Sequence, residues 1–172
     1  MVIKLSLVAA LLAASTACGA RAPEPETPAF EARAAAAQVQ KMPFSANVLE
    51  AARTNDAYRR VLFTGARTQL AVMTIPVGGD IGAELHANVE QIFVVVAGSG
   101  KLVLGGSERA LAPGDVVVVT PGSRHDVVND GTEPLRLYTV YAPPNHLDGT
   151  VHATKADAAA DRADEAFGHG VR

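Results

Sequence analysis

Short apolar runs broken by turn-forming residues dominate the middle of the chain. Between Arg59 and Pro143, runs rich in Val, Ile, Leu, Thr and Tyr are separated by Gly, Pro, Asn and Asp. Runs of this kind are typical of strands, and their close spacing leaves no room for helices between them. The pattern predicts an all-β antiparallel sandwich or barrel, with strands near 60–64, 69–75, 81–86, 91–96, 101–104, 109–111, 116–120, 125–128 and 135–141. Glycine-containing breaks at 98–100 and 130–131 are predicted to be hairpin turns.

One predicted strand carries a pair of side chains suited to a metal. Glu84 and His86 are two residues apart, so on a strand they point to the same face, with their Cα atoms about 7 Å apart. A carboxylate and an imidazole inside a barrel suit a divalent ion, because buried charged groups need a partner that replaces their lost hydration. Taken alone, such a pair is more typical of an exposed strand face.

The segments around this pair resemble the two sequence motifs of the cupin superfamily. The first motif resembles the stretch from Gly78 through Glu84-Leu85-His86 to Gly98. The second resembles the stretch from Gly114 through Thr120-Pro121-Gly122 and His125 to Asn129, with every spacing kept and Thr120 where the family has proline. The resemblance implies the cupin double-stranded β-helix, a jelly-roll barrel. It also implies a metal bound in the barrel by Glu84, His86 and His125, and a small single-domain protein that is able to form a homodimer.

The family's first motif leaves two candidates for a further ligand. It allows three or four residues after the second histidine position, which gives Glu90 or Gln91. Neighbouring strand residues face opposite ways, so only one of them points inward. The six-residue spacing to Gly98 is met from Gln91, which favours Gln91 as the inward residue and keeps Glu90 as the alternative.

The ligand set departs from the family in having Glu84 where most metal cupins have histidine. Mixed oxygen and nitrogen ligands suit manganese, iron, nickel or zinc better than monovalent copper. Open coordination positions would allow isomerase, lyase or dioxygenase chemistry on a small polar substrate such as a sugar acid or an oxo-acid. Candidate acid–base groups are Glu90 and Tyr141. The alternative function is a non-catalytic module of the cell envelope that binds a ligand or a metal.

The first residues have the pattern of an export signal. Lys4 precedes a run of small and apolar residues too short to span a bilayer, and Ser15-Thr16-Ala17 then leads into Cys18. This arrangement resembles the lipobox of bacterial lipoproteins, in which the cysteine is lipidated, although Ser15 replaces the usual leucine. We therefore expect a signal peptide over 1–17 and an envelope protein anchored through Cys18. Simple cleavage, leaving an exported free thiol, is the alternative.

Composition divides the rest of the chain. Residues 18–42 are rich in Ala, Pro, Glu and Arg and are predicted to be a flexible tether. Residues 43–153 form the predicted barrel domain. Residues 154–172 form a polar tail with the composition of a solvated helix. His146 and His152 fall in the loop after the last predicted strand, and we expect them to be solvated.

Charge and cysteine content exclude several classes of protein. The 172 residues include 15 Lys and Arg against 18 Asp and Glu, a formal net charge of −3, with no basic stripe that could bind nucleic acid. With 48% hydrophobic residues the chain is not of the disordered class. A single cysteine rules out an intramolecular disulfide. The expected partner is a small molecule, with membrane contact only through a lipid on Cys18.

Overall fold

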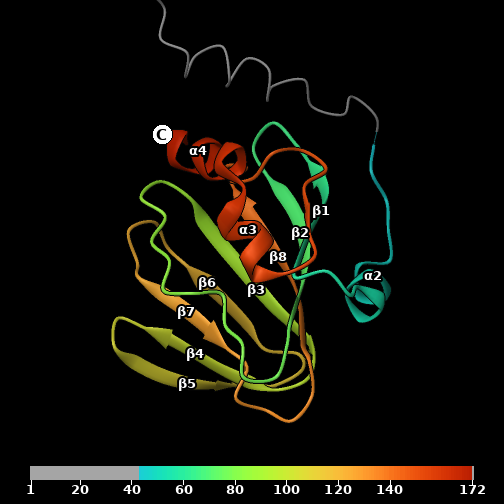
Figure 1. Cartoon of the computed structure of the whole chain (residues 1–172), viewed down its shortest axis with the longest axis vertical. Coiled ribbons are helices and arrows are strands. Elements are labelled where there is room, and N and C mark those ends of the chain that lie inside the picture. Colours follow the sequence, from blue (N-terminus) through green and yellow to red (C-terminus); the bar gives the residue numbers. More distant parts are fainter. Residues whose placement is uncertain (1–42, 172) are drawn as a thin grey trace, which may run out of the picture.

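The structure is a computed structural model that describes residues 43–171 (Figure 1). The signal peptide predicted for 1–17, the tether predicted for 18–42 and Cys18 lie outside the described residues. In chain order the elements are α2 (Val48–Thr54), β1 (Arg59–Thr64), β2 (Gln69–Ile75), β3 (Glu90–Ala97), β4 (Gly100–Leu104), β5 (Ser107–Leu111), β6 (Val116–Val119), β7 (His125–Val128), β8 (Leu135–Ala142), β9 (Val151–His152), α3 (Lys155–Ala160) and α4 (Arg162–Gly170).

Two antiparallel sheets face each other and confirm the predicted all-β jelly roll. One sheet has the order β6-β3-β8-β2-β1-β9, and the other has the order β5-β4-β7. Strand β8 alternates buried and half-buried residues along its whole length, as expected where one sheet face packs on the core. Met73 and Phe93 are each 1% exposed and belong to the main core cluster.

The segment predicted as a strand over 81–86 is not one. It touches the smaller sheet only through isolated bridges, from Asp80 to Val128 and from Glu84 to His125. Gly82 between these bridges has a φ of 86°, a left-handed conformation that interrupts a strand. This segment therefore pairs with the smaller sheet at two separate points and does not form a continuous strand.

The two breaks predicted to be hairpin turns are crossovers between the sheets. Residues 98–99 connect β3 to β4, and residues 129–134 connect β7 to β8, so each joins strands of different sheets. The crossovers lie against each other: a Cβ on Gly98 would stand 2.5 Å from the carbonyl oxygen of Pro134. The two-residue hairpin is instead Gly105-Gly106 between β4 and β5, with φ values of 56° and 87°.

Asn129, the last residue of the second motif, holds the β7–β8 crossover against the end of β2. Its Nδ2 donates to the carbonyl oxygens of Ile75 and Glu133 at 2.9 Å each, and its Oδ1 accepts from the Gly131 amide at 3.0 Å. The side chain is fully buried. We therefore assign this motif residue a structural role.

Replacing Asn129 with aspartate tests that role. Asn129→Asp keeps the shape but turns the Nδ2 donor into an oxygen facing two carbonyl oxygens. We expect the free energy of unfolding to fall by about 2–3 kcal/mol in urea denaturation at pH 7. The matched control is Asp130→Asn at the exposed neighbouring position, which should change stability by less than about 0.5 kcal/mol. Equal effects of the two variants would contradict the assignment.

The helices lie outside the sheets. Helix α2 packs on the outer face of the large sheet, where Ala52 contacts Val72 and Val96. Helices α3 and α4 follow β9, and α4 lies at the end of the molecule opposite the β4–β5 hairpin (Figure 1). No helix within residues 43–171 is long and apolar enough to cross a membrane.

Candidate metal centre and cavity

Backbone pairing places Glu84 beside His125. The Glu84 amide donates to the His125 carbonyl at 2.8 Å, and the His125 amide donates to the Glu84 carbonyl at 3.0 Å. The His86 carbonyl accepts from the Gly122 amide of the second motif at 2.8 Å. These three backbone hydrogen bonds join the two motifs beside Glu84, His86 and His125. This pairing brings their side chains together although the first motif is not on a regular strand.

Glu84, His86 and His125 form a compact group of possible metal ligands. One ligand atom from each lies within 4.8 Å of the other two. Glu84 Oε2 is 3.3 Å from His86 Nε2 and 4.0 Å from His125 Nε2. His86 Nε2 is buried and has no hydrogen-bond partner among the described residues. An unpaired buried nitrogen next to a carboxylate and a second imidazole fits a cation in this position.

The contact with Ser123 fixes the position of one hydrogen on His125. Its Nδ1 lies 3.0 Å from the Ser123 carbonyl oxygen, which can only accept, so Nδ1 carries a hydrogen. Its Nε2 lies 3.2 Å from Gln91 Oε1, and Gln91 Nε2 donates to Thr139 Oγ1 at 3.3 Å. In this amide orientation a neutral His125 directs the Nε2 lone pair toward another acceptor. Two facing lone pairs repel each other, and a cation bound by both atoms would remove the repulsion. This arrangement also fits a set of metal ligands.

The structure also separates the two candidates for the further ligand. Gln91 is 1% exposed and lies beside His125, whereas Glu90 is exposed at the start of β3. The two residues are neighbours on a strand and therefore face opposite sides of the sheet. The alternative in which Glu90 points inward is wrong, and so is its candidacy as an acid–base group inside the barrel.

Arg59 is a cavity residue that no sequence motif indicated. It belongs to β1, is 6% exposed, and places Nη2 3.7 Å from Glu84 Oε1. Burial by itself would raise the pKa of Glu84. The approach of the His86 imidazole to 3.3 Å and the positive charge of Arg59 outweigh burial and lower this pKa below its ordinary value. Glu84 is therefore a carboxylate at neutral pH, the form that binds metal.

Tyr141 lies between the metal candidates and the C-terminal part of the chain. It is 1% exposed, its ring centroid is 6.3 Å from that of His86 and 4.9 Å from that of His146, and burial raises its pKa to about 12. The phenol thus keeps its proton at neutral pH. Tyr138, on the opposite face of β8, packs near helix α2 instead.

His146 and His152 are buried, which corrects the expectation that both are solvated. They are 6% and 3% exposed. His146 Nδ1 donates to Asp164 Oδ2 at 2.7 Å, and His152 Nε2 lies 3.2 Å from Asp161 Oδ2. Both aspartates come from the C-terminal helical segment, so this polar tail packs on the barrel. Asp164 itself is only 4% exposed.

Gln69 holds the His146 segment in place. This fully buried side chain donates to the His146 carbonyl at 2.7 Å, and its Oε1 accepts from the amides of His146 and Asn145 at 2.9 and 3.2 Å. The amide of Leu147 donates to Asp164 Oδ1 at 2.7 Å. Residues of strand β2 and helix α4 therefore both hydrogen-bond to the backbone of this loop.

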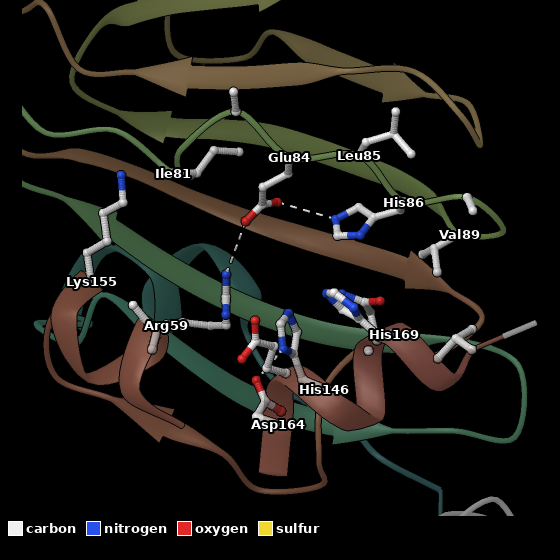
Figure 2. Close-up of a pocket in the computed structure, with 18 of the residues that line it drawn as sticks. Arg59, Ile81, Glu84, Leu85, His86, Val89, His146, Lys155, Asp164 and His169 are labelled. Atoms are coloured by element: carbon white, nitrogen blue, oxygen red, sulfur yellow. Dashed lines mark hydrogen bonds and ion pairs between the residues drawn. The ribbon is translucent and has the colours of Figure 1, made fainter. Parts of the chain in front are cut away.

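A cavity of about 590 Å³ joins the metal candidates to the C-terminal helices. Glu84 and His86 line one wall, and residues of α3 and α4, including Lys155 and Asp164, line another. Figure 2 shows Glu84 between Arg59 and His86, with His146 and Asp164 across the cavity from the Glu84–His86 segment. The volume suits a small molecule.

Comparison with known proteins agrees with this architecture. The family model for the cupin domain matches residues 71–141. The chain is 42% identical over 124 residues to the uncharacterized protein YrkC of Bacillus subtilis, covering 69% of this chain and 67% of YrkC. It is also similar to the crystal structure of BH2720 from Bacillus halodurans, at 38% identity and a TM-score of 0.69, covering 70% of this chain and 96% of that one. A third structure, TT1209 from Thermus thermophilus, shares the fold at 23% identity and a TM-score of 0.53, covering 58% of this chain and 96% of that one. Sequence motifs, sheet topology and relatives together show that this chain belongs to the cupin superfamily.

Proposed function

We propose that the protein binds a divalent metal in the barrel and is a metal-dependent enzyme acting on a small polar acid. The observation that carries the proposal is the convergence of ligand atoms of Glu84, His86 and His125, with Glu84 and His86 in the wall of a cavity of about 590 Å³. Gln91 Oε1 is the further ligand in this proposal, since it faces His125 Nε2. Manganese, iron, nickel and zinc all match this mixed donor set.

A divalent ion in this position supplies a Lewis acid that polarises a carbonyl group or activates water or dioxygen. The protein's own side chains would bind and orient the substrate. Tyr141 retains its proton and is able to donate a hydrogen bond into the site, because burial holds its pKa at about 12. Residues of helices α3 and α4 line one side of the cavity.

Substitution of Glu84 tests the enzymatic proposal. We expect metal-loaded wild-type protein to convert at least one member of a panel of uronates and oxo-acids. Glu84→Ala should lower that turnover by at least about 100-fold with an unchanged circular dichroism spectrum, because it removes the only carboxylate of the proposed ligand set. The exposed Glu108→Ala serves as the matched control and should keep wild-type rates. Ligand binding without turnover across the panel would contradict the enzyme and favour a non-catalytic binding module.

We further propose that the protein works in the cell envelope, anchored by a lipid on Cys18. The support is the order of a basic residue, an apolar run and small residues ahead of this lone cysteine. In a bacterial host fed labelled palmitate, the wild-type protein should incorporate label and partition into the membrane fraction. Cys18→Ser should do neither, since it removes the acceptor thiol. Equal labelling of the two proteins would contradict the anchor.

A further inference from the structure

Arg59 is a buried cation with unused hydrogen-bonding capacity. Its side chain is 8% exposed and lines the cavity, and its Nε has no hydrogen-bond partner among the described residues. The approach of Nη2 to Glu84 at 3.7 Å is an ion pair beyond hydrogen-bond distance. A guanidinium offers five donors in a planar fork that matches a carboxylate, so this side chain has the chemistry of an acid-binding group.

His146 presents an unpaired nitrogen to the same cavity. Asp164 accepts the Nδ1 hydrogen at 2.7 Å, which leaves Nε2 without a hydrogen. Burial, acting against the attraction of Asp164, lowers the pKa of His146 below its ordinary value, so the ring is neutral at pH 7. Nε2 is buried and has no hydrogen-bond partner within 43–171. It is therefore a free acceptor, matched to a hydroxyl group that donates.

The unpaired atoms are concentrated at this cavity. Within the described residues, seven buried side-chain atoms lack a partner, and four of them belong to cavity-lining residues: Arg59, His86, Asn145 and His146. His86 Nε2 is accounted for by the proposed metal. The others are one donor, on Arg59, and two acceptors, His146 Nε2 and Asn145 Oδ1. Buried polar atoms rarely remain unpaired, so such a cluster indicates a ligand of complementary polarity.

We propose that this cavity binds a small hydroxycarboxylic acid. Arg59 holds the carboxylate, and His146 and Asn145 accept hydrogen bonds from hydroxyl groups. Asp164 of α4 acts as a positioning residue, because it orients His146 and fixes its tautomer. The inference rests on the proposed function in one respect, that the cavity takes a small molecule. A divalent ion bound at Glu84 would offset that carboxylate's attraction for Arg59 and leave the guanidinium available to an anionic ligand.

Three compounds with the same carbon skeleton separate the two contacts. Lactate has a carboxylate and a hydroxyl, propionate lacks the hydroxyl, and propane-1,2-diol lacks the carboxylate. We expect lactate to bind at least about tenfold more tightly than either of the others, measured by isothermal titration calorimetry on the full-length protein with and without Mn²⁺. The inference would be overturned, without any variant, if lactate bound no more tightly than propionate or propane-1,2-diol, both with and without Mn²⁺.

Variants assign the contacts to residues. Arg59→Gln should abolish the preference for lactate over propane-1,2-diol, and Arg59→Lys should restore part of it. Arg60→Gln, at the exposed next position of β1, is the matched control and should bind as wild type does. Asp164→Asn should reduce the preference for lactate over propionate while the preference over the diol persists, a split that general loss of structure would not produce. Unchanged preferences in the Arg59 and Asp164 variants would overturn the assignment.

Metal binding and the preference for lactate test the proposed function and this site separately. Normal metal binding with no preference for lactate would refute the hydroxycarboxylate site alone. A preference for lactate that depends on Arg59, in a protein that binds no metal, would support this site and refute the metal-dependent enzyme.

Discussion

A protein carrying both His86→Ala and His125→Ala is expected to lose its bound metal. The double variant removes two of the three side chains whose ligand atoms lie within 4.8 Å of one another. Replacing a residue that only supports a metal ligand commonly lowers the affinity for the metal 10- to 100-fold. Removing two of the ligands themselves should therefore lower the affinity by more than about 100-fold. Elemental analysis of the purified protein, followed by competition with a chelator, measures the effect.

His169 provides the matched control for this experiment. It also lines the cavity but is exposed and lies outside the Glu84–His86–His125 group. His169→Ala should keep the metal content of the wild-type protein. Equal metal content in the double variant and the wild type would contradict the assigned centre, whatever metal is present.

Asp164→Ala is expected to cause the largest loss of stability. The carboxylate is buried and accepts two hydrogen bonds of 2.7 Å each, from His146 Nδ1 and from the Leu147 amide. Removing it leaves both donors buried without a partner and releases α4 from the barrel. We expect the free energy of unfolding to fall by about 3–5 kcal/mol at pH 7. The exposed neighbour Glu165→Ala should lower it by less than about 0.5 kcal/mol.

The effect of Asp164→Ala should depend on pH in a defined direction. Burial would raise the pKa of Asp164, but hydrogen bonds from His146 and the Leu147 amide outweigh burial and lower it below 3.8. A lowered folded-state pKa means that the stabilisation is present above pH 3.8 and is lost as the pH falls through the folded value. The stability difference between wild type and variant should therefore shrink as the pH falls below about 4, where Asp164 takes up a proton. A difference that does not shrink below this pH would contradict the assignment.

The core of the fold was accessible from the sequence because local patterns encode it. Apolar runs separated by turn-forming residues predicted strands β1 to β8, and Met73 and Phe93 were expected in the core. The errors lie where the chain leaves this regularity. Residues 98–100 contain the glycines of a hairpin, yet the close approach of Gly98 to Pro134 shows that glycine is needed there for a crossover. Sequence pattern does not distinguish these two uses of glycine.

The candidate metal centre was accessible for a related reason. Motif spacing places Glu84, His86, Gln91 and His125 close together once the barrel forms, and these side chains do meet in the structure. The opposite wall has no such local pattern. Arg59 looks like an ordinary strand arginine beside exposed Arg60, and His146 and Asp164 are 18 residues apart in a polar stretch. Their burial depends on how the C-terminal helices pack, which is a long-range property.

Crystals of the protein grown with saturating Mn²⁺ give the most direct test of the central claim, that Glu84, His86 and His125 hold a divalent metal. An anomalous difference map collected at the manganese edge locates the ion without assumptions about ligands. We predict one strong peak within bonding distance of Glu84 Oε2, His86 Nε2 and His125 Nε2, with Gln91 Oε1 turned toward it. No peak between these atoms, or a peak at other residues alone, would contradict it.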